Sequence, residues 1–287
     1  MTKTHGETNE LPPIPKRNRE SHKGTYGRVG IVAGSRGMSG AAVLAGTASL
    51  RSGAGLATVA CPASIQPIVA ASEPCLMTLA LPEDDRGRVT QEAAEHVLDR
   101  PWDALLIGPG LGQSPGVDRF VRRIVQAFTG PIVIDADGLN SLARGGDLRG
   151  LSRSILTPHA GEFQRLVGKS ADEPIVDRVG SACELQRRTG GVIILKGAGT
   201  VVVGPDDYRI NTTGNPGMAT GGTGDVLAGM LVGLLGQGWS AFDAGRLAVH
   251  LHGLAGDIAA REKGEISLMA RDLLDAIPRA FIQYTGH

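Results

Sequence analysis

The sequence has few cysteines and few aromatic residues, and it has neither an excess of one charge nor a long apolar run. Its three cysteines, Cys61, Cys75 and Cys183, lie far apart and form no CxxC pair. This spacing is typical of a reducing compartment, and we expect all three side chains to be buried as small apolar groups. Aromatic residues make up 3% of the chain, so platforms on which bases or sugars could stack are scarce.

The two kinds of charge balance, with 29 Lys and Arg side chains against 29 Asp and Glu. A neutral chain offers no electrostatic attraction to nucleic acid or to an anionic membrane. No apolar stretch reaches the roughly 18 residues that span a bilayer. The opening residues MTKTHGETNE also lack the apolar core of a signal peptide. The sequence therefore predicts a cytoplasmic protein that binds neither nucleic acid nor membrane.

Glycine is abundant, at 42 of 287 residues, which is about twice its usual share. Hydrophobic residues make up 41%, as expected of a globular chain with a sizeable core. A glycine excess in such a chain indicates backbone positions with positive φ or close backbone approach, which phosphate-binding loops require.

Short apolar runs alternate with glycine-punctuated helical stretches. The runs are continuous, which is typical of strands buried on both faces of a parallel sheet. Three helices are clearest near the C-terminal end: one follows Gly224 and ends at Gly236 and Gly238, one spans 247–258, and one follows Ser267 through 277. The predicted strands cover residues 29–33, 56–60, 104–107, 132–135, 155–156, 192–195 and 201–203.

We therefore predict an α/β fold, a three-layer α/β/α sandwich around a mostly parallel central sheet. Residues 1–25 are polar and contain several prolines, and we expect them to form an N-terminal tail or an edge segment. Residues 26–287 show no internal repeat or linker and are predicted to form a single domain. In such sheets ligands collect at the carboxyl ends of the strands, where the glycine clusters of this sequence fall.

The most informative cluster is the segment 215–225, NPGMATGGTGD, which leads directly into a predicted helix. Its small residues would expose consecutive backbone N–H groups at the helix N-terminus, and with the helix dipole these form an anion site suited to phosphate. Asp225 is placed where a carboxylate could take a proton from a hydroxyl that attacks phosphorus. The alternative is a glycine-rich turn in which Asp225 only favours the helix start.

Four further clusters follow predicted strands. GPGLG at 108–112 is either a ligand-binding turn or a plain tight turn, and it is not GxGxxG because Gln113 stands in place of the last glycine. In TPHAGE at 157–162, His159 is expected to bond a ligand, with a satisfied core histidine as the alternative. Glu162 would either hold Mg²⁺ through water or favour a helix start. KGAGT at 196–200 is predicted to be a hairpin loop that suits a nucleotide or is an ordinary solvated turn. DADGLN at 135–140 ends its strand with paired carboxylates.

Together these clusters resemble the ribokinase-like superfamily and, within it, the ADP/ATP-dependent NAD(P)H-hydrate dehydratases. The resemblance extends in order over roughly residues 24–280, and one departure is Ala160, where the family usually has proline. The matching stretches are YGRV at 26–29, AGS at 33–35, GAA at 40–42, GPGLG at 108–112, DADGLN at 135–140, TPH at 157–159, KG at 196–197 with Thr200, and TGGTGD at 220–225.

The resemblance implies a hydro-lyase that repairs damaged nicotinamide cofactor. Such an enzyme dehydrates the S epimer of NADH or NADPH hydrate with ADP as the usual co-substrate, and it releases AMP and phosphate. The resemblance implies that Asp225 is the base and that the N–H groups of Gly222, Thr223 and Gly224 form an anion hole. It also implies that Lys196, Gly197, Ala198, Gly199, Thr200 and Gly224 bind the nucleotide and that Ala41, Gly110 or Gly112, His159 and Asp225 bind the hydrate.

The same resemblance implies Mg²⁺ bridging the phosphates, through protein ligands that the sequence does not identify, and a homo-oligomer, a tetramer in the family. The family is often fused to an epimerase domain, and this chain is too short to hold one, so we expect a separate, functionally coupled epimerase. Two other hypotheses stay open: a ribokinase-like kinase for a vitamin precursor or sugar, and a nucleotide-binding regulatory protein without turnover. The presence of Asp225 beside an intact glycine loop argues against the second.

Overall fold

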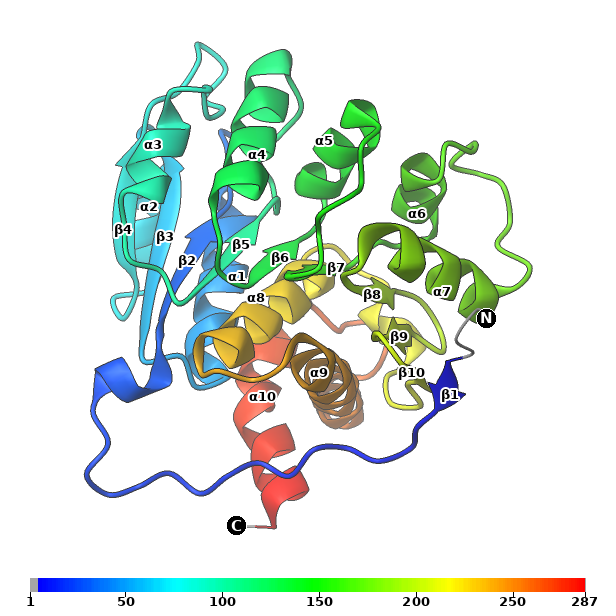
Figure 1. The fold of residues 1–287 in the computed structure, drawn as a ribbon. Coiled ribbons are helices and arrows are strands. Elements are labelled where there is room, and N and C mark those ends of the chain that lie inside the picture. The colour runs from blue at the N-terminus through cyan, green and yellow to red at the C-terminus, as the bar shows by residue number, and fades with distance from the viewer. Residues whose placement is uncertain (1–4, 287) are drawn as a thin grey trace.

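In the part of the chain that the structure describes, a single sheet of ten strands forms the centre of the molecule (Figure 1). The computed structural model describes residues 5–286. The strands are β1 (Gly6–Glu7), β2 (Arg28–Val32), β3 (Leu56–Pro62), β4 (Met77–Leu81), β5 (Ala104–Ile107), β6 (Ile132–Ile134), β7 (Ser154–Leu156), β8 (Val192–Leu195), β9 (Val201–Val203) and β10 (Asp207–Ile210). Their order across the sheet is β1-β10-β9-β8-β7-β6-β5-β2-β3-β4.

Neighbouring strands run parallel except at β9, which is antiparallel to both β8 and β10. Strands β5 to β8 lie side by side in chain order, but β2 lies between β5 and β3, so the order reverses where β5 meets β2. Open α/β sheets bind ligands at such a switch point, outside the carboxyl ends of the strands.

Helices cover both faces of the sheet. They are α1 (Ser39–Arg51), α2 (Gln66–Ser72), α3 (Ala93–Leu98), α4 (Pro115–Ala127), α5 (Asp137–Gly145), α6 (Ala160–Leu166), α7 (Arg178–Thr189), α8 (Thr223–Gly236), α9 (Ala241–Lys263) and α10 (Ala270–Thr285). One hydrophobic core lies under α1, α2, α8, α9 and α10, and a second lies under α3 to α7 (Figure 1). Central strands contribute side chains to both cores. In β5, for example, Leu106 packs in the first core and Leu105 in the second. The predicted α/β/α sandwich is confirmed.

All seven predicted strands are present within one or two residues, and the three predicted helices near the C-terminus are α8, α9 and α10. The sequence does not predict β1, β4 and β10, which lie at or near the edges of the sheet and are partly exposed, so they lack the continuous apolar run of a central strand. Cys61 and Cys183 are buried as expected, but the prediction is wrong for Cys75, whose side chain is exposed.

The N-terminal segment runs from β1 along the outer side of α9 and α10 (Figure 1). β1 pairs with β10. Beyond β1, side chains of the helices bond the main chain of the segment: Arg246 donates to Glu10 O at 2.7 Å, and the Tyr284 hydroxyl donates to Pro12 O at 3.0 Å. Hydrogen bonds to the backbone therefore help to hold a segment that has few apolar side chains.

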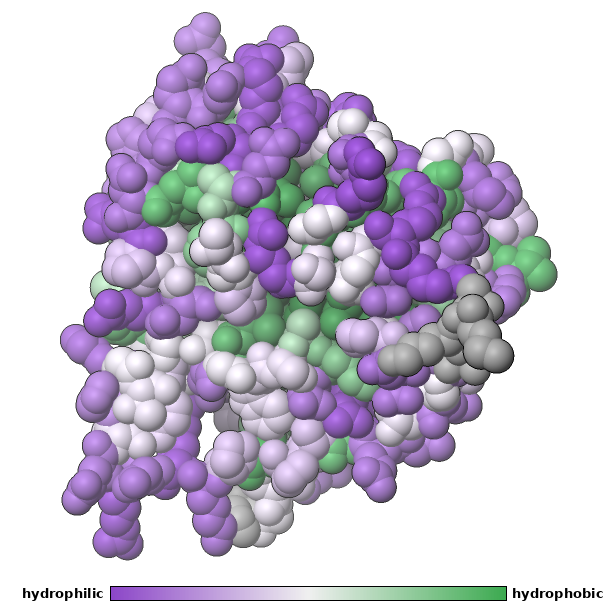
Figure 2. Space-filling model, in the orientation of Figure 1, coloured by the Kyte–Doolittle hydropathy of each residue, from purple (hydrophilic) through white to green (hydrophobic). Residues whose placement is uncertain are grey.

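The surface seen in Figure 2 is mostly hydrophilic, and apolar side chains show mainly in the seams between elements. This pattern is typical of amphipathic helices whose apolar faces turn toward a sheet. Among residues 5–286, no helix combines the length and the apolar character that a membrane span requires.

Helix α8 packs closely on α1 because glycines of α8 face the α1 main chain. A Cβ added to Gly229 would lie 2.2 Å from Ala45 O, and one added to Gly233 would lie 2.6 Å from Ser49 O. Both distances are shorter than real Cβ contacts, so the α1 backbone occupies the space of the missing side chains. Since α8 carries the predicted anion site at its N-terminus, this contact helps to set where that site lies.

We expect Gly229→Ala to lower the free energy of unfolding by about 1–3 kcal/mol, because the added methyl group overpacks a rigid contact. Gly116→Ala in α4 is the matched control, since the atom nearest to its added Cβ lies 3.5 Å away. Urea unfolding followed by circular dichroism measures both. Equal losses of stability in the two variants would contradict the close packing at Gly229.

Candidate active site

Four of the predicted clusters meet at the carboxyl edge of the sheet, beside the switch point between β5 and β2. They follow β5, β6, β7 and β8, which are neighbours in the sheet. Their main chains touch: Lys196 N donates to Pro158 O at 2.8 Å, and a Cβ on Gly108 would lie 1.8 Å from Asp135 O. The fold therefore brings together segments that are far apart in the sequence.

The start of α8 belongs to the same edge. Gly222 caps the helix with a φ of 94°, a left-handed conformation that favours glycine. Val226 N donates to Gly222 O at 3.1 Å, so the N–H groups of Thr223 and Gly224 precede the helical ladder, as an anion site requires. The Thr223 hydroxyl donates to Met218 O at 3.0 Å and ties the preceding loop to the helix start.

Lys196 links α8 to the strand ends. Its Nζ lies 2.7 Å from Asp135 Oδ1 and 3.8 Å from Glu162 Oε2, and it would lie 3.5 Å from a Cβ on Gly224. Asp135 and Glu162 are only 1% and 5% exposed. Burial disfavours the Lys196 cation, but the two carboxylates outweigh burial and raise the pKa of Lys196. A cation is thus held beside the helix start by two buried anions.

Asp225 lies half-buried in the first turn of α8. Burial raises the pKa of its carboxyl to about 7; the negative charge of Asp135 adds to the rise, and Lys196 opposes it. A group whose pKa lies near the working pH is suited to take up a proton during a reaction. The first turn of α8 therefore carries both N–H groups that could bind an anion and a carboxylate that could accept a proton.

His159 and Glu162 begin α6 as a reciprocal capping pair. The N–H of His159 donates to Glu162 Oε2 at 2.8 Å, and Nδ1 of His159 accepts from the N–H of Gly161 at 3.1 Å. Glu162 therefore supports a helix start, and its carboxylate also faces Lys196. Burial raises the pKa of Glu162 to about 6, although Lys196 acts against the rise.

The imidazole of His159 is half-exposed at this edge. Burial, followed by the charges of Lys196 and Arg165, lowers the pKa of His159. Since Nδ1 accepts a hydrogen bond, the neutral ring carries its proton on Nε2. A neutral imidazole can bond a polar ligand without adding a charge.

The turns after β2 and β5 form one wall beside the switch point. Gly34 N donates to Pro109 O at 2.8 Å, and the Ser35 hydroxyl donates to Gly110 O at 2.8 Å. A Cβ on Gly110 would lie 3.0 Å from the Cβ of Ala41. The structure therefore places Ala41 and Gly110 side by side.

The acidic turn after β6 braces this wall. Asp137 Oδ2 accepts from the N–H of Gly112 at 2.9 Å, and Arg165 donates to Asn140 Oδ1 at 2.9 Å. One of the paired carboxylates of this turn thus supports a neighbouring loop, while the other, Asp135, holds Lys196.

The predicted hairpin between β8 and β9 is confirmed. In its loop Gly197, Ala198 and Gly199 are exposed, and the two glycines have φ values of 141° and 62°. The Thr200 hydroxyl donates to Gly197 O at 2.8 Å and closes the loop. The exposed main chain of this loop lies next to the Lys196 cation, as a nucleotide site would require.

Three side chains that the sequence does not single out support the same edge: Arg178, His252 and Asp257. Arg178, at the start of α7, donates to Leu195 O at 2.9 Å and to Lys196 O at 3.2 Å. The other two come from α9. All three bond main-chain groups of segments elsewhere in the chain and form no motif. His252 and Asp257 are not distinguished in the sequence from other polar residues of the same helix, such as Arg246 and His250.

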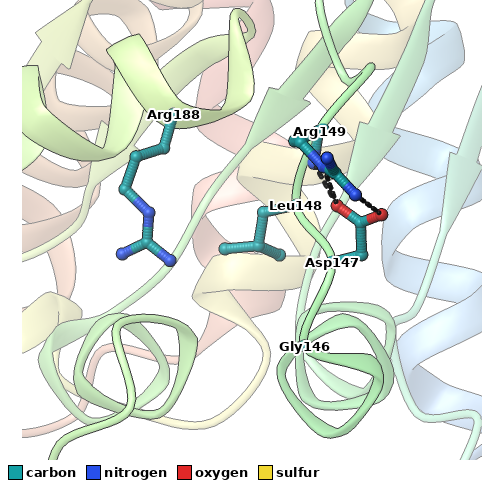
Figure 3. Close-up of a pocket in the computed structure, with 5 residues that line it drawn as sticks. All are labelled: Gly146, Asp147, Leu148, Arg149 and Arg188. Carbon is teal, nitrogen blue, oxygen red and sulfur yellow. Dashed lines mark hydrogen bonds and ion pairs between the residues drawn. The ribbon is translucent and has the colours of Figure 1, made fainter.

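A hollow at the other end of the strands, near their amino ends, is separate from this site. It is lined by Gly146, Asp147, Leu148, Arg149 and Arg188 (Figure 3). Helix α5 starts at the carboxyl edge and ends beside this hollow. There Asp147 pairs with Arg149 at 3.0 Å (Figure 3).

Known proteins resemble this chain over nearly its whole length. The family described as NAD(P)H-hydrate dehydratase matches residues 29–279. The chain belongs to the NAD(P)H-hydrate dehydratase family. The ADP-dependent (S)-NAD(P)H-hydrate dehydratase of Bacillus subtilis is 36% identical over 273 residues, which are 94% of this chain and 95% of that protein.

Solved structures of the family share the fold. The ADP/ATP-dependent NAD(P)H-hydrate dehydratase from Bacillus subtilis, co-crystallized with ATP and Mg²⁺, superposes with a TM-score of 0.82 at 34% identity and 95% coverage of both chains. A ribokinase-like superfamily protein from Enterococcus faecalis V583 has a TM-score of 0.82 at 28% identity, over 96% of this chain and 93% of that chain. The predicted ribokinase-like architecture is therefore confirmed.

Other curated relatives are about twice as long as this chain. The bifunctional NAD(P)H-hydrate repair enzyme Nnr of Moorella thermoacetica is 45% identical over 272 residues, which are 92% of this chain but 51% of that protein. The Escherichia coli Nnr is 41% identical over 268 residues, or 50% of its length. The chain thus spans about half the length of these relatives.

A magnesium ion that arrived with a nucleotide would find two carboxylates in the Lys196 cluster. Within residues 5–286, no three His, Cys, Asp or Glu side chains are grouped so as to hold a metal alone. Mg²⁺ usually keeps several waters and binds one or two carboxylates together with phosphates. Asp135 and Glu162 supply hard oxygen atoms beside the helix start, which matches this shared mode of binding.

We expect Asp135→Asn to lower the pKa of Asp225, because the charge of Asp135 raises that pKa and Lys196 would remain to oppose it. A carbon-13 NMR titration of the Asp225 carboxyl measures the shift. Asp147→Asn, at the other end of the strands, is the control and should leave the titration unchanged. An unchanged or higher pKa in Asp135→Asn would show that the two carboxylates are not coupled.

Proposed function

We propose that this chain dehydrates the S epimer of NADH or NADPH hydrate at the expense of ADP and releases AMP and phosphate. The protein would thus be a hydro-lyase that regenerates reduced nicotinamide cofactor. The observation that supports this most is Asp225, which lies in the first turn of α8 with a pKa of about 7. The activity for which the Bacillus subtilis relative is named supports the choice of substrate and of ADP.

A phosphoryl transfer at this site would make a difficult elimination easy, because hydroxide is a poor leaving group. The C6 hydroxyl of the hydrate attacks the terminal phosphorus of ADP, the bond from that phosphorus to AMP breaks, and the hydroxyl proton passes to Asp225. The electron pair of the ring nitrogen then expels phosphate, and loss of a proton from the neighbouring ring carbon restores the double bond. ADP and hydrate thus become AMP, phosphate and reduced cofactor.

In this proposal the start of α8 stabilises the transferred group. The N–H groups of Gly222, Thr223 and Gly224 would bond the oxygens on which charge develops, where fixed dipoles contribute most to catalysis. Lys196 adds a positive charge close to Gly224. The carboxylates of Asp135 and Glu162 keep this cation in place.

The two substrates would approach from opposite sides of Asp225. The hairpin loop Lys196, Gly197, Ala198, Gly199 and Thr200, together with Gly224, would bind the nucleotide. The wall formed by Ala41 and Gly110, with Gly112 and His159, would bind the hydrate. The hairpin follows β8, whereas the wall formed by Ala41 and Gly110 lies at the junction of β5 and β2; His159 follows β7 and lies between them.

A magnesium ion bound to the nucleotide would be held by phosphate oxygens and, through water, by Glu162. When bound, it would neutralise phosphate charge.

Further proposals concern partners and location. We expect a homo-oligomer, a tetramer by family resemblance, that acts in the cytoplasm. An epimerase, separate from the residues described here, would supply the S epimer. Size-exclusion chromatography with light scattering would test the oligomeric state.

We expect Asp225→Asn to lower turnover by about a hundredfold or more, because general base catalysis is lost. The assay mixes the S epimer of NADH hydrate with ADP and follows both the absorbance of reduced nicotinamide and the release of phosphate. Asp243→Asn, also in the first turn of a helix, is the matched control and should keep wild-type turnover. Near wild-type turnover of Asp225→Asn would remove Asp225 from the role of base. Failure of the wild type to restore reduced cofactor with ADP or ATP would contradict the proposed function.

We expect Lys196→Ala to raise the KM for ADP by about tenfold, because a charge-assisted bond to phosphate is lost. The KM for the hydrate should change less. Lys169→Ala is the control, because Lys169 is exposed and pairs with Glu173. A larger change in the KM for the hydrate than for ADP would mean that the two pockets are reversed.

A further inference from the structure

His252 connects α9 to the first turn of α8. Its Nε2 lies 2.9 Å from Thr223 O. A carbonyl oxygen can only accept a hydrogen bond, so Nε2 carries the proton and donates it. His252 lies in the middle of α9, a helix of 23 residues that covers one face of the sheet.

The bonded carbonyl belongs to the same peptide group as the N–H of Gly224. A peptide group is planar, so the direction of its C=O fixes the direction of its N–H. Gly224 N is one of the donors that precede the helical ladder of α8. The contact with His252 therefore acts on the orientation of a group assigned to the anion hole under the proposed function.

Other groups of α9 hold the loop that leads into α8. Asp257 Oδ2 accepts from the N–H of Gly214 at 3.0 Å, and Asp257 Oδ1 accepts from Asn215 Nδ2 at 2.9 Å. A Cβ on Gly256 would lie 2.2 Å from Met218 Sδ, so a small residue lets the loop lie against the helix. Helix α9 thus supports the loop before α8, and His252 is the residue through which α9 contacts the first turn of α8.

The imidazole of His252 is neutral. Burial lowers the pKa of His252 to about 4; the bond to Thr223 O opposes the shift, and the positive charge of Lys196 favours it. A neutral ring can therefore orient the bonded peptide group without adding a net charge. A hydrogen bond to the C=O side of a peptide also polarises its N–H and strengthens it as a donor.

We propose that His252 is a positioning residue for phosphoryl transfer: its Nε2–H holds the Thr223–Gly224 peptide so that the Gly224 N–H points at the migrating group. The inference rests on the proposed function, because that function makes the N–H an anion donor. His252 itself does not touch the substrate. Its effect is expected in the transition state, where charge on the transferred oxygens is greatest.

Three substitutions distinguish positioning from packing. The amide nitrogen of Gln can occupy nearly the place of His Nε2, whereas the amide of Asn is one methylene shorter and Ala has no donor. We expect His252→Ala and His252→Asn to lower kcat by about ten- to a hundredfold, as is typical for residues that orient another group. His252→Gln should stay within about threefold of the wild type, and KM for ADP should change by less than about threefold in all three.

Circular dichroism and thermal unfolding check that the variants fold. Wild-type kcat in His252→Ala, or equal loss in the Gln and Ala variants, would overturn the inference. A rise in the KM for ADP with unchanged kcat would likewise show a binding role rather than a positioning role. Rescue by Gln alone, with the loss confined to kcat, is the expected result.

A second measurement separates failure of the inference from failure of the proposed function. Aluminium fluoride mimics a transferred phosphoryl group, and calorimetry can compare the affinity for AMP with and without it. We expect it to tighten AMP binding in the wild type and in His252→Gln but not in His252→Ala. This pattern would support the inference even if the hydrate is not the substrate, whereas equal tightening in all variants would overturn it.

Discussion

One ammonium group, Nζ of Lys196, makes the arrangement of charges at the carboxyl edge possible. Asp135 and Glu162 are buried there, and Asp225 lies close enough to sense both. Carboxylates crowded together away from water repel one another and lose hydration, so some would become protonated without a cation. Lys196 bonds Asp135, faces Glu162 and lies beside the start of α8. The charged state of the whole edge therefore depends on where this side chain is held.

Glycines position the helix that completes the site. Gly229 lets α8 lie against the α1 backbone, and Gly256 lets the loop before α8 lie against α9. Gly222 provides the left-handed cap between loop and helix. Both uses that the glycine excess predicts, positive φ and close backbone approach, therefore occur around this helix.

Central strands and the glycine-rich or acidic loops that follow them could be predicted from the sequence because both have strong local signals. A strand buried on both faces is a continuous apolar run, and β8 is predicted with its observed bounds. Strands near the sheet edges, such as β4 and β10, are partly exposed and give no such run. Arg178 and His252 were missed for a different reason: each bonds the main chain of a segment far away in the sequence, and neither residue type nor spacing records that contact.

The amino-acid order already determined that glycine-rich and acidic segments follow buried parallel strands, and parallel strands carry their carboxyl ends to one edge. That geometry made it predictable that these segments meet at one edge with Asp225 at a helix start, the edge for which we propose phosphate binding. Only the tertiary structure decided which acidic groups are neutralised and which is left with a pKa of about 7. The physical reason is that a pKa depends on burial and on distances between charges, and here those charges come from Asp135, Glu162, Lys196 and Asp225, on four separate segments of the chain.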